Sequence, residues 1–228
     1  MEAIMIGDCT PSPISRRRLL EMFIAASAAL LIPPVVSLFA EPAGRVPTSK
    51  QGKGPFYPIE KPADLDADLT VVQGKTGKAQ GQVIYVMGQV VDVKGQPLPG
   101  AQVEIWQANT FGRYTHPNDR NPAPLDPNFE GYGLVVTDRQ GRYKFKTIKP
   151  ASYPSGGGGA RPPHIHFLIT AGAHRFATQM YFAGEPLNEK DWLLGNSANR
   201  ETLIAKPTAP AGDIEPDALV VVWDIVLQ

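Results

Sequence analysis

Short runs of β-branched and aromatic residues, each ended by glycine or proline, constrain the fold of this chain more than any other feature. Residues 83–93 read VIYVMGQVVDV and stop at the turn sequence KGQPLPG of residues 94–100. Residues 142–148 alternate, with Tyr143 and Phe145 set between charged residues, which is typical of a half-buried strand. This pattern predicts short strands joined by tight turns and argues against a helical bundle.

The remaining runs complete an all-β prediction. Further strands are expected at residues 101–106, 134–137, 164–170, 176–182 and 219–227, and only residues 189–194 suggest a short helix. Several short strands separated by turn signals favour an antiparallel β-sandwich with long functional loops and few short helices.

The same reading divides the chain into three parts. Residues 1–40 are expected to form an export signal, residues 41–82 an N-terminal arm, and residues 83–228 the β-sandwich domain. Two long stretches without strand signals, residues 108–133 and 149–163, interrupt the domain. Long irregular loops in a compact domain are usually functional or disordered, and we interpret these two as functional.

The first 40 residues have the pattern of a targeting segment. The basic block SRRRLL at residues 15–20 precedes the apolar stretch MFIAASAALLI at residues 22–32. Paired arginines with two leucines behind them resemble a twin-arginine export signal. An ordinary secretory signal, or an uncleaved anchor continuing to Ala40, remains open. The export interpretation places the mature protein in the periplasm or outside the cell, with no stable membrane span after processing.

Charge and cysteine content exclude several kinds of function. The 228 residues include 22 Lys and Arg against 22 Asp and Glu, so the formal charge of zero argues against nucleic-acid binding. The single cysteine, Cys9, excludes an intrachain disulfide and a cysteine-based zinc or iron–sulfur site. Any metal must be held by His, Tyr, Asp or Glu.

His164 and His166 are the strongest metal-binding candidates from the residues alone. Side chains alternate along a strand, so a His-x-His pair places both imidazoles on one face. The pair is equally compatible with a metal site, for which zinc would be the default, and with one core histidine beside a hydrogen-bonded one. His116 and His174 lie in predicted loops, where we expect them to be solvated.

Five segments in order resemble the intradiol ring-cleavage dioxygenases, and most of all the iron-bearing chain of the protocatechuate dioxygenases. They are WQANTFGRYTHPND (106–119), LDPNF (125–129), TIKPASYP (147–154), RPPHIHF (161–167) and TQMYFAGEP (178–186). The resemblance covers most of residues 54–186. It implies a non-haem Fe(III) enzyme that opens a catechol between its two hydroxyls with O2, giving a cis,cis-muconate-type diacid.

The resemblance also implies a site. Its motifs assign the iron ligands to Tyr114, Tyr153, His164 and His166. Phenolate oxygen is a hard anionic donor that suits Fe(III). Tyr153 would be the ligand that leaves the metal and accepts a proton from the catechol.

Two further residues receive roles from the resemblance. Arg161 would stabilise negative charge on the substrate ring, and Gln179 would make a polar contact near the reacting carbon or near that arginine. From the residues alone, Arg161 could be a surface ion-pair residue and Gln179 a polar residue on a sheet face.

The chain departs from the family in one loop and in its export signal. Four consecutive glycines, residues 156–159, stand where relatives carry a bulkier insert, so the substrate is open beyond the catechol class. The resemblance also allows a homo-oligomer or a second dioxygenase chain as partner.

Two other classes of function remain. An exported β-sandwich binding module with a vestigial metal site would explain the strands but would leave the tyrosines and histidines without a role. A zinc hydrolase is weaker, because no carboxylate stands in a recognisable general-base motif near the His pair.

Overall fold

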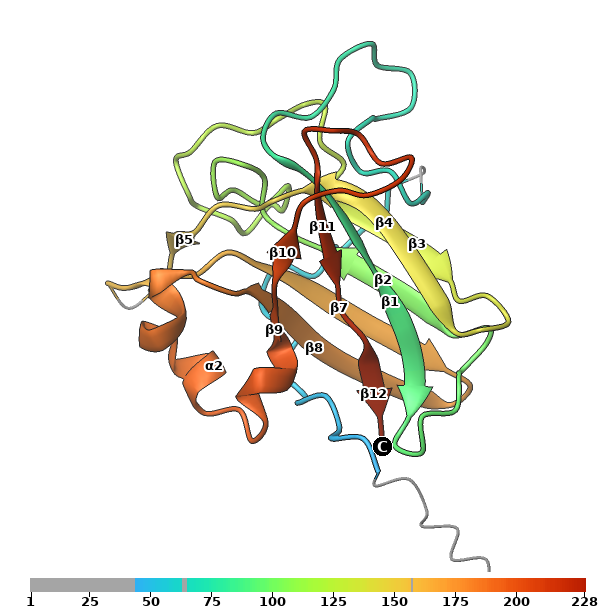
Figure 1. The fold of residues 1–228 in the computed structure, drawn as a ribbon. Helices are drawn as coiled ribbons and strands as arrows, with labels where there is room; N and C mark the ends of the chain where they lie inside the picture. The colour runs from blue at the N-terminus through green and yellow to red at the C-terminus, as the bar shows by residue number, and fades with distance from the viewer. Residues whose placement is uncertain (1–43, 63–64, 157) are drawn as a thin grey trace, which may run out of the picture. The chain divides into compact units, whose positions relative to one another are not determined.

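The computed structural model describes residues 44–62, 65–156 and 158–228 (Figure 1). The predicted export signal and Cys9 lie outside the described residues. Residues 41–228 cluster as one unit, and the described part of that unit is built almost entirely of strands and loops.

Two five-stranded sheets carry the fold, and the all-β class is confirmed. The first sheet contains β1 (Val83–Asp92), β4 (Arg142–Ile148), β10 (Pro207–Thr208), β11 (Leu219–Val222) and β12 (Ile225–Leu227). The second has the order β3 (Tyr132–Val136), β2 (Gln102–Trp106), β7 (His164–Ala171), β8 (His174–Phe182) and β9 (Ile204–Ala205). A short ladder joins β5 (Tyr153–Pro154) to β6 (Ala160–Arg161).

The sequence predicted a purely antiparallel sandwich, and this part of the prediction is wrong because the strand pairing is mixed. β1 pairs antiparallel with β4 but parallel with both β11 and β12, and β8 pairs parallel with β9. Sequence periodicity reports which residues share a face and carries no information on the direction of the neighbouring strand. Whether β11 runs parallel or antiparallel to β1 depends on the path of the long connection formed by residues 149–218.

The two sheets face each other across one core. Inward residues from the first sheet, such as Ile84 and Phe145, pack in the same buried cluster as Ile105 and Phe167 of the second. The predicted alternation in β4 is confirmed, since Tyr143 and Phe145 are buried while Arg142 and Lys144 are exposed. Burial of such apolar faces is the main favourable contribution to folding.

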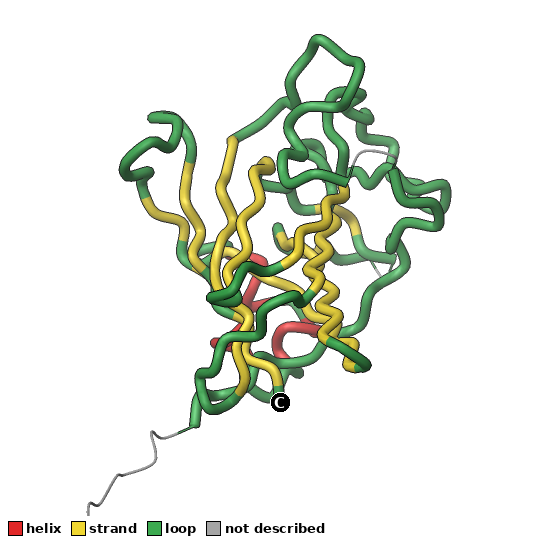
Figure 2. Tube along the Cα trace, turned by 90° about the vertical axis from the view of Figure 1, so that its right-hand side faces the viewer, coloured by secondary structure: helices red, strands yellow, loops and turns green. Residues whose placement is uncertain are grey.

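β7 is buried on both faces, and the two faces differ in chemistry. Ile165, Phe167 and Ile169 point into the sandwich core. The period-two alternation therefore turns His164 and His166 to the opposite face, where the long loops lie. In Figure 2 the longest loops gather at the end of the strands away from the C-terminus.

Among the described residues, helical structure is limited to three short pieces. They are η1 (Pro186–Lys190), α2 (Trp192–Gly195) and η2 (Arg200–Leu203), of which the first two cover the region predicted as a helix. Asp191 begins α2 by accepting a hydrogen bond from the backbone N–H of Leu194 at 2.8 Å. None of the helices in the described ranges has the length and apolar character needed to cross a membrane.

The predicted strand at residues 219–227 is divided in two beside Gly88. The N–H of Trp223 donates to the carbonyl of Met87 (2.8 Å), and the N–H of Gln89 donates to Oδ1 of Asp224 (3.0 Å). A Cβ at Gly88 would collide with the carbonyl oxygen of Trp223. The break between β11 and β12 therefore depends on the absence of a side chain at this position of β1.

Gly88→Ala is expected to lower the free energy of unfolding by about 1–3 kcal/mol, because backbone atoms must shift to admit the methyl group. Urea unfolding followed by circular dichroism measures the change. Gly195→Ala is the matched control, since no atom lies within 4 Å of a Cβ there. Equal midpoints for the two variants would contradict the close-contact explanation.

Candidate functional site

Four side chains that could donate lone pairs converge at one point. His164 and His166 come from β7, Tyr153 from β5, and Tyr114 from the loop between β2 and β3. His166 Nε2 lies 3.2 Å from His164 Nε2 and 3.1 Å from the hydroxyl oxygen of Tyr114. The hydroxyl oxygens of Tyr114 and Tyr153 each lie 3.4 Å from His164 Nε2.

Gly112 allows the two tyrosines to approach each other. Its backbone has φ of +78°, and a Cβ there would collide with the carbonyl oxygen of Ser152, the residue before Tyr153. Asn109 braces the same turn, since its side-chain oxygen accepts from the N–H groups of Phe111 (2.9 Å) and Arg113 (3.0 Å). The rings of Tyr114 and Tyr153 consequently meet edge to face, 5.4 Å between centroids.

Hydrogen bonding fixes the tautomer of His164. Its Nδ1 lies 2.7 Å from the carbonyl oxygen of Pro162, and since a carbonyl only accepts, Nδ1 carries the proton. The lone pair of Nε2 therefore points at the other three donor atoms. This is the arrangement in which a histidine ligand is oriented by a second partner behind it.

His166 is oriented by packing instead. Its Nδ1 is buried and has no hydrogen-bond partner among the described residues. The indole of Trp106 stacks on the ring at 4.9 Å between centroids and 10° between planes. On the ring edge, a Cβ at Gly54 would lie only 3.1 Å from Cε1 of His166. The indole and the Gly54 backbone together hold the imidazole in place.

Burial keeps both imidazoles in their neutral, singly protonated form. Desolvation, followed by the charge of Arg161, lowers the pKa of His164 to about 3. Desolvation, followed by His164, lowers the pKa of His166 well below its usual value. Both rings are therefore neutral at pH 7, which is the form that binds metals.

The tyrosines are neutral unless a metal cation binds their oxygens. Burial, and then the neighbouring Tyr153, raises the pKa of Tyr114 well above its usual value. Burial also raises the pKa of Tyr153, whereas the charge of Arg161 opposes that rise. Two phenolates in this site would need a strong positive charge at the point where the oxygens converge.

The donor set fits a single metal ion. Atoms that share one ion at bond lengths of about 2 Å lie about 3 to 3.5 Å apart, and the four distances given above, from 3.1 to 3.4 Å, fall in that range. Two imidazole lone pairs facing each other at 3.2 Å repel unless a cation or a proton lies between them. Within the described ranges no three His, Cys, Asp or Glu residues group as a metal site, so the tyrosines are essential to this one.

Arg161 lies beside the donors in a network of its own. It pairs directly with Tyr153 in the β5–β6 ladder. Its guanidinium donates to Asp191 Oδ2 at 2.5 Å, to the Tyr181 hydroxyl at 2.8 Å and to Gln179 Oε1 at 3.0 Å. Arg161 is therefore not a surface ion-pair residue, and its charge is held next to Tyr153.

The predicted site residues separate into two groups. Tyr114, Tyr153, His164 and His166 meet at one point, with Arg161 and Gln179 adjacent to them. His174 is exposed at the start of β8, and His116 accepts from the N–H of Asn118 in a loop, so neither joins the donors. Gln179 sits opposite His166 in the β7–β8 register.

Sequence reasoning did not identify Trp106, Asp191 or Tyr181 as supports of the site. A signal for Trp106 was present in the period-two alternation of residues 102–106, which places Trp106 on the face opposite the core residues Val103 and Ile105. In the β2–β7 pairing this is the face that carries His166. Asp191 and Tyr181 reach Arg161 through tertiary packing, and no sequence spacing reports that contact.

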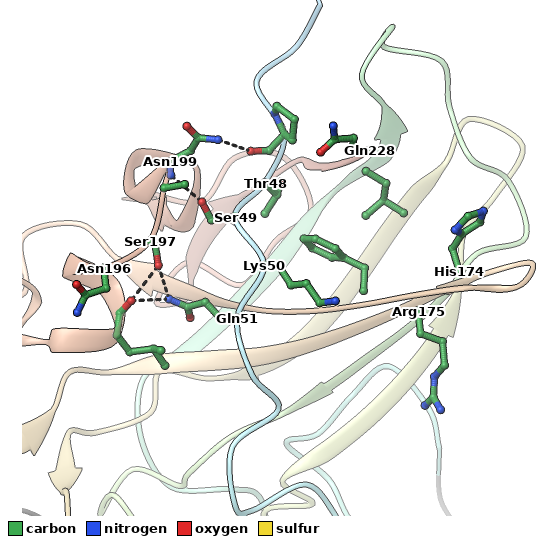
Figure 3. Close-up of a pocket in the computed structure, with 15 residues that line it drawn as sticks. Thr48, Ser49, Lys50, Gln51, His174, Arg175, Asn196, Ser197, Asn199 and Gln228 are labelled. Carbon is green, nitrogen blue, oxygen red and sulfur yellow. Dashed lines mark hydrogen bonds between the residues drawn. The ribbon is translucent and has the colours of Figure 1, made fainter.

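Two pockets lie away from the four donors. One is a groove of about 600 Å³ between residues 47–51, the start of β8, residues 193–199 and the C-terminus (Figure 3). Figure 3 shows Gln51 at its wall, bonded to Ser197. Gln51 also accepts from Tyr181 at 3.1 Å, which links this wall to the Arg161 network. None of the four donors lines the groove.

Comparisons with known proteins agree on one family. A protein-family model described as Dioxygenase matches residues 53–228. The protocatechuate 3,4-dioxygenase beta chain of Burkholderia cepacia is 43% identical over 180 residues, covering 76% of each chain. A catechol 1,2-dioxygenase of Acinetobacter baylyi is 34% identical over 168 residues, covering 64% of this chain and 52% of that protein.

Solved structures show the same likeness. The dioxygenase domain of a dioxygenase carbohydrate-binding protein fusion from Streptomyces sp. SirexAA-E aligns with a TM-score of 0.60 and 28% identity, covering 80% of this chain and 98% of that one. Catechol 1,2-dioxygenase from Pseudomonas arvilla C-1 aligns with a TM-score of 0.61 and 28% identity. The alignment covers 79% of this chain and 62% of that enzyme.

Asp191→Asn is expected to lower the free energy of unfolding by about 3 kcal/mol, because it leaves the buried Arg161 charge without its carboxylate. Asparagine keeps the cap of α2, so the helix start is not the cause. Urea unfolding measures the effect. Glu189→Gln breaks the exposed pair with Arg200 and should change the midpoint little, and an equal loss in both variants would contradict this explanation.

Proposed function

Because the chain belongs to the intradiol ring-cleavage dioxygenase family, we propose that it inserts both atoms of O2 into a catechol-type substrate and opens the ring between the hydroxyls. The product is a cis,cis-muconate-type diacid. The observation that carries this proposal is the convergence of two tyrosine oxygens and two imidazole nitrogens, joined by four contacts of 3.1–3.4 Å.

Ferric iron is the metal we propose for this donor set. Tyr114 and Tyr153 would supply hard anionic oxygens and His164 and His166 neutral nitrogens, a combination that favours Fe(III) over softer ions. When bound, ferric iron supplies Lewis acidity and accepts electron density from a chelated diol. The alternative of a binding module leaves these four convergent groups without a role.

The two tyrosines have different surroundings and take different roles. Tyr114 is 3% exposed and packed among aromatic rings, so it serves as a permanent anchor. Tyr153 is only partly buried and lies beside Arg161. As the phenolate that would hold the metal, Tyr153 would accept one catechol proton and become a neutral hydroxyl. Its partly exposed position beside Arg161 leaves room for that change.

Arg161 and Gln179 complete the site. The guanidinium, held by Asp191 and Tyr181, would stabilise negative charge that develops on the substrate ring. Gln179 holds one arm of the same guanidinium, so its role in this proposal is to orient Arg161. Phe56, which packs on Tyr114 at 4.7 Å between centroids, shields that side from water.

The substrate we propose is a catechol with or without a para substituent, protocatechuate being the first to test. The protocatechuate 3,4-dioxygenase beta chain is 43% identical, and its name supports that choice. The glycine run at residues 156–159 removes side-chain bulk beside Tyr153, which favours larger catechols as well. The same relative, named as one chain type, supports a second dioxygenase chain or a homo-oligomer as partner.

The site of action we propose is the periplasm or the extracellular space. The SRRRLL block and the apolar stretch behind it support export, with the twin-arginine route as the proposed path. That route moves folded proteins, which suits a protein loaded with its metal before export.

Purified protein is expected to hold about one ferric ion per chain and to be red-brown from tyrosinate-to-iron charge transfer. Tyr114→Phe and His164→Ala should each lose most of the iron, because each removes an anchoring ligand. Tyr153→Phe should keep much of its iron and lose turnover. Elemental analysis and visible spectra measure these outcomes, and colourless protein fully loaded with zinc would exclude the proposed chemistry.

Turnover is tested on a panel of catechol, protocatechuate, hydroxyquinol and larger plant-derived catechols. We expect oxygen uptake and a diacid product that contains both atoms of 18O2, measured by mass spectrometry. A yellow semialdehyde would indicate cleavage outside the diol and contradict the assignment. No reaction across the panel by iron-loaded protein would favour the binding-module alternative.

A further inference from the structure

Glu104 is a buried carboxylate that the proposed chemistry does not use. Its side chain is 4% exposed and lies on β2. One oxygen, Oε2, accepts from the hydroxyl of Tyr57 at 2.7 Å and from the hydroxyl of Tyr132 at 2.8 Å, and it lies 3.0 Å from Nζ of Lys61. Burying a charge is costly unless it is fully paired, so an arrangement with three donors on one oxygen calls for a function.

Two of these three donors belong to a segment that covers the metal donors. We call residues 53–62 the strap. The Tyr57 ring packs edge to face on Trp106, 4.9 Å between centroids, and Trp106 stacks on His166. One residue earlier in the strap, the ring of Phe56 lies 4.7 Å from Tyr114 and 6.3 Å from Tyr153.

The start of the strap is fitted to the same site. Gly54 has φ of +72°, which side-chain-bearing residues rarely adopt, and a Cβ there would press on the ring of His166. Strap residues thus touch three of the four donor residues. A shift of the strap would change both the packing on those residues and the wall of the space beside them.

Few polar contacts hold the strap in place. Backbone hydrogen bonds anchor the chain before it, from Gln51 N–H to the Ala177 carbonyl (2.9 Å), and after it, from Leu69 N–H to the Lys146 carbonyl (2.8 Å). Among the described residues, no backbone hydrogen bond joins residues 53–62 to the rest of the domain. The contacts of Tyr57 and Lys61 with Glu104 are therefore its main polar anchors.

We propose that Glu104 is a positioning residue that clamps the strap onto the metal-donor residues. By holding Tyr57 and Lys61 it keeps Phe56 against the tyrosines and Gly54 against His166, and so it sets one wall of the substrate pocket. The part of this inference that concerns substrate rests on the proposed function. The part that concerns the strap rests on geometry alone.

Three variants distinguish release of the strap from a loss of overall stability. Glu104→Gln removes the negative charge and leaves an amide that cannot accept all three donors. Tyr57→Phe removes one anchor with almost no change in volume and keeps the buried pair with Lys61. Glu60→Gln is the control, since Glu60 is an exposed carboxylate in the strap with no hydrogen bond or ion pair to another described residue. Thermal unfolding by circular dichroism establishes that each variant is folded.

The first measurement is the rate at which chymotrypsin cuts after Phe56 in the iron-loaded protein. Loss of a hydrogen bond to a charged group should release the strap and raise this rate about tenfold in Tyr57→Phe and Glu104→Gln. Glu60→Gln should be cut at the parent rate. Cleavage of all three variants at the parent rate would overturn the clamp.

The second measurement is steady-state kinetics with catechol at equal iron content. A displaced pocket wall should raise KM about tenfold in the two clamp variants, with a smaller change in kcat. Faster cleavage with an unchanged KM would overturn the role of Glu104 in setting the pocket wall. Faster cleavage in a protein that, like the parent, turns over no catechol would support the clamp and reject the proposed function instead.

Discussion

The pairing of β7 with β2 on one side and β8 on the other is the constraint on which the rest of the structure depends. It places Ile165 and Phe167 in the core and, by the same alternation, turns His164 and His166 to the loop side. It also sets Trp106 opposite His166 on one flank and Gln179 opposite it on the other. The strand therefore joins the stability of the sandwich to the geometry of the site.

The four donor side chains beside this strand carry no charge of their own in the absence of a metal. Burial lowers the pKa values of the two imidazoles and raises that of Tyr114, so both the imidazolium and the phenolate forms are disfavoured. The one adjacent cationic side chain, among those the structure places at the site, is Arg161, and its charge is balanced by Asp191. Glu104, at the far side of Trp106, is balanced in the same way by Lys61. Both of these charges have a partner, which lowers the cost of burying them.

Much of the fold could be predicted from local pattern, and the errors have specific causes. The alternation in residues 142–148 and the paired histidines were readable because side chains in a strand repeat with period two. The parallel pairing of β1 with β11 and β12 was not readable, since it joins segments more than 120 residues apart. The break in the strand at Trp223 and Asp224 could not be predicted either, because it depends on the close contact of Trp223 with Gly88 in another strand.

For the site, the sequence by itself determined the identity and order of the donor residues, through motifs that a known family shares, and the common face of His164 and His166, through strand periodicity. Only the tertiary structure decided that Tyr114 and Tyr153 reach those histidines, because that contact depends on the close approach of Gly112 to Ser152. It alone also decided how Asp191 and Tyr181 hold Arg161 and how Glu104 holds Tyr57 and Lys61. Such contacts join residues far apart along the chain, and their geometry follows from packing rather than from spacing.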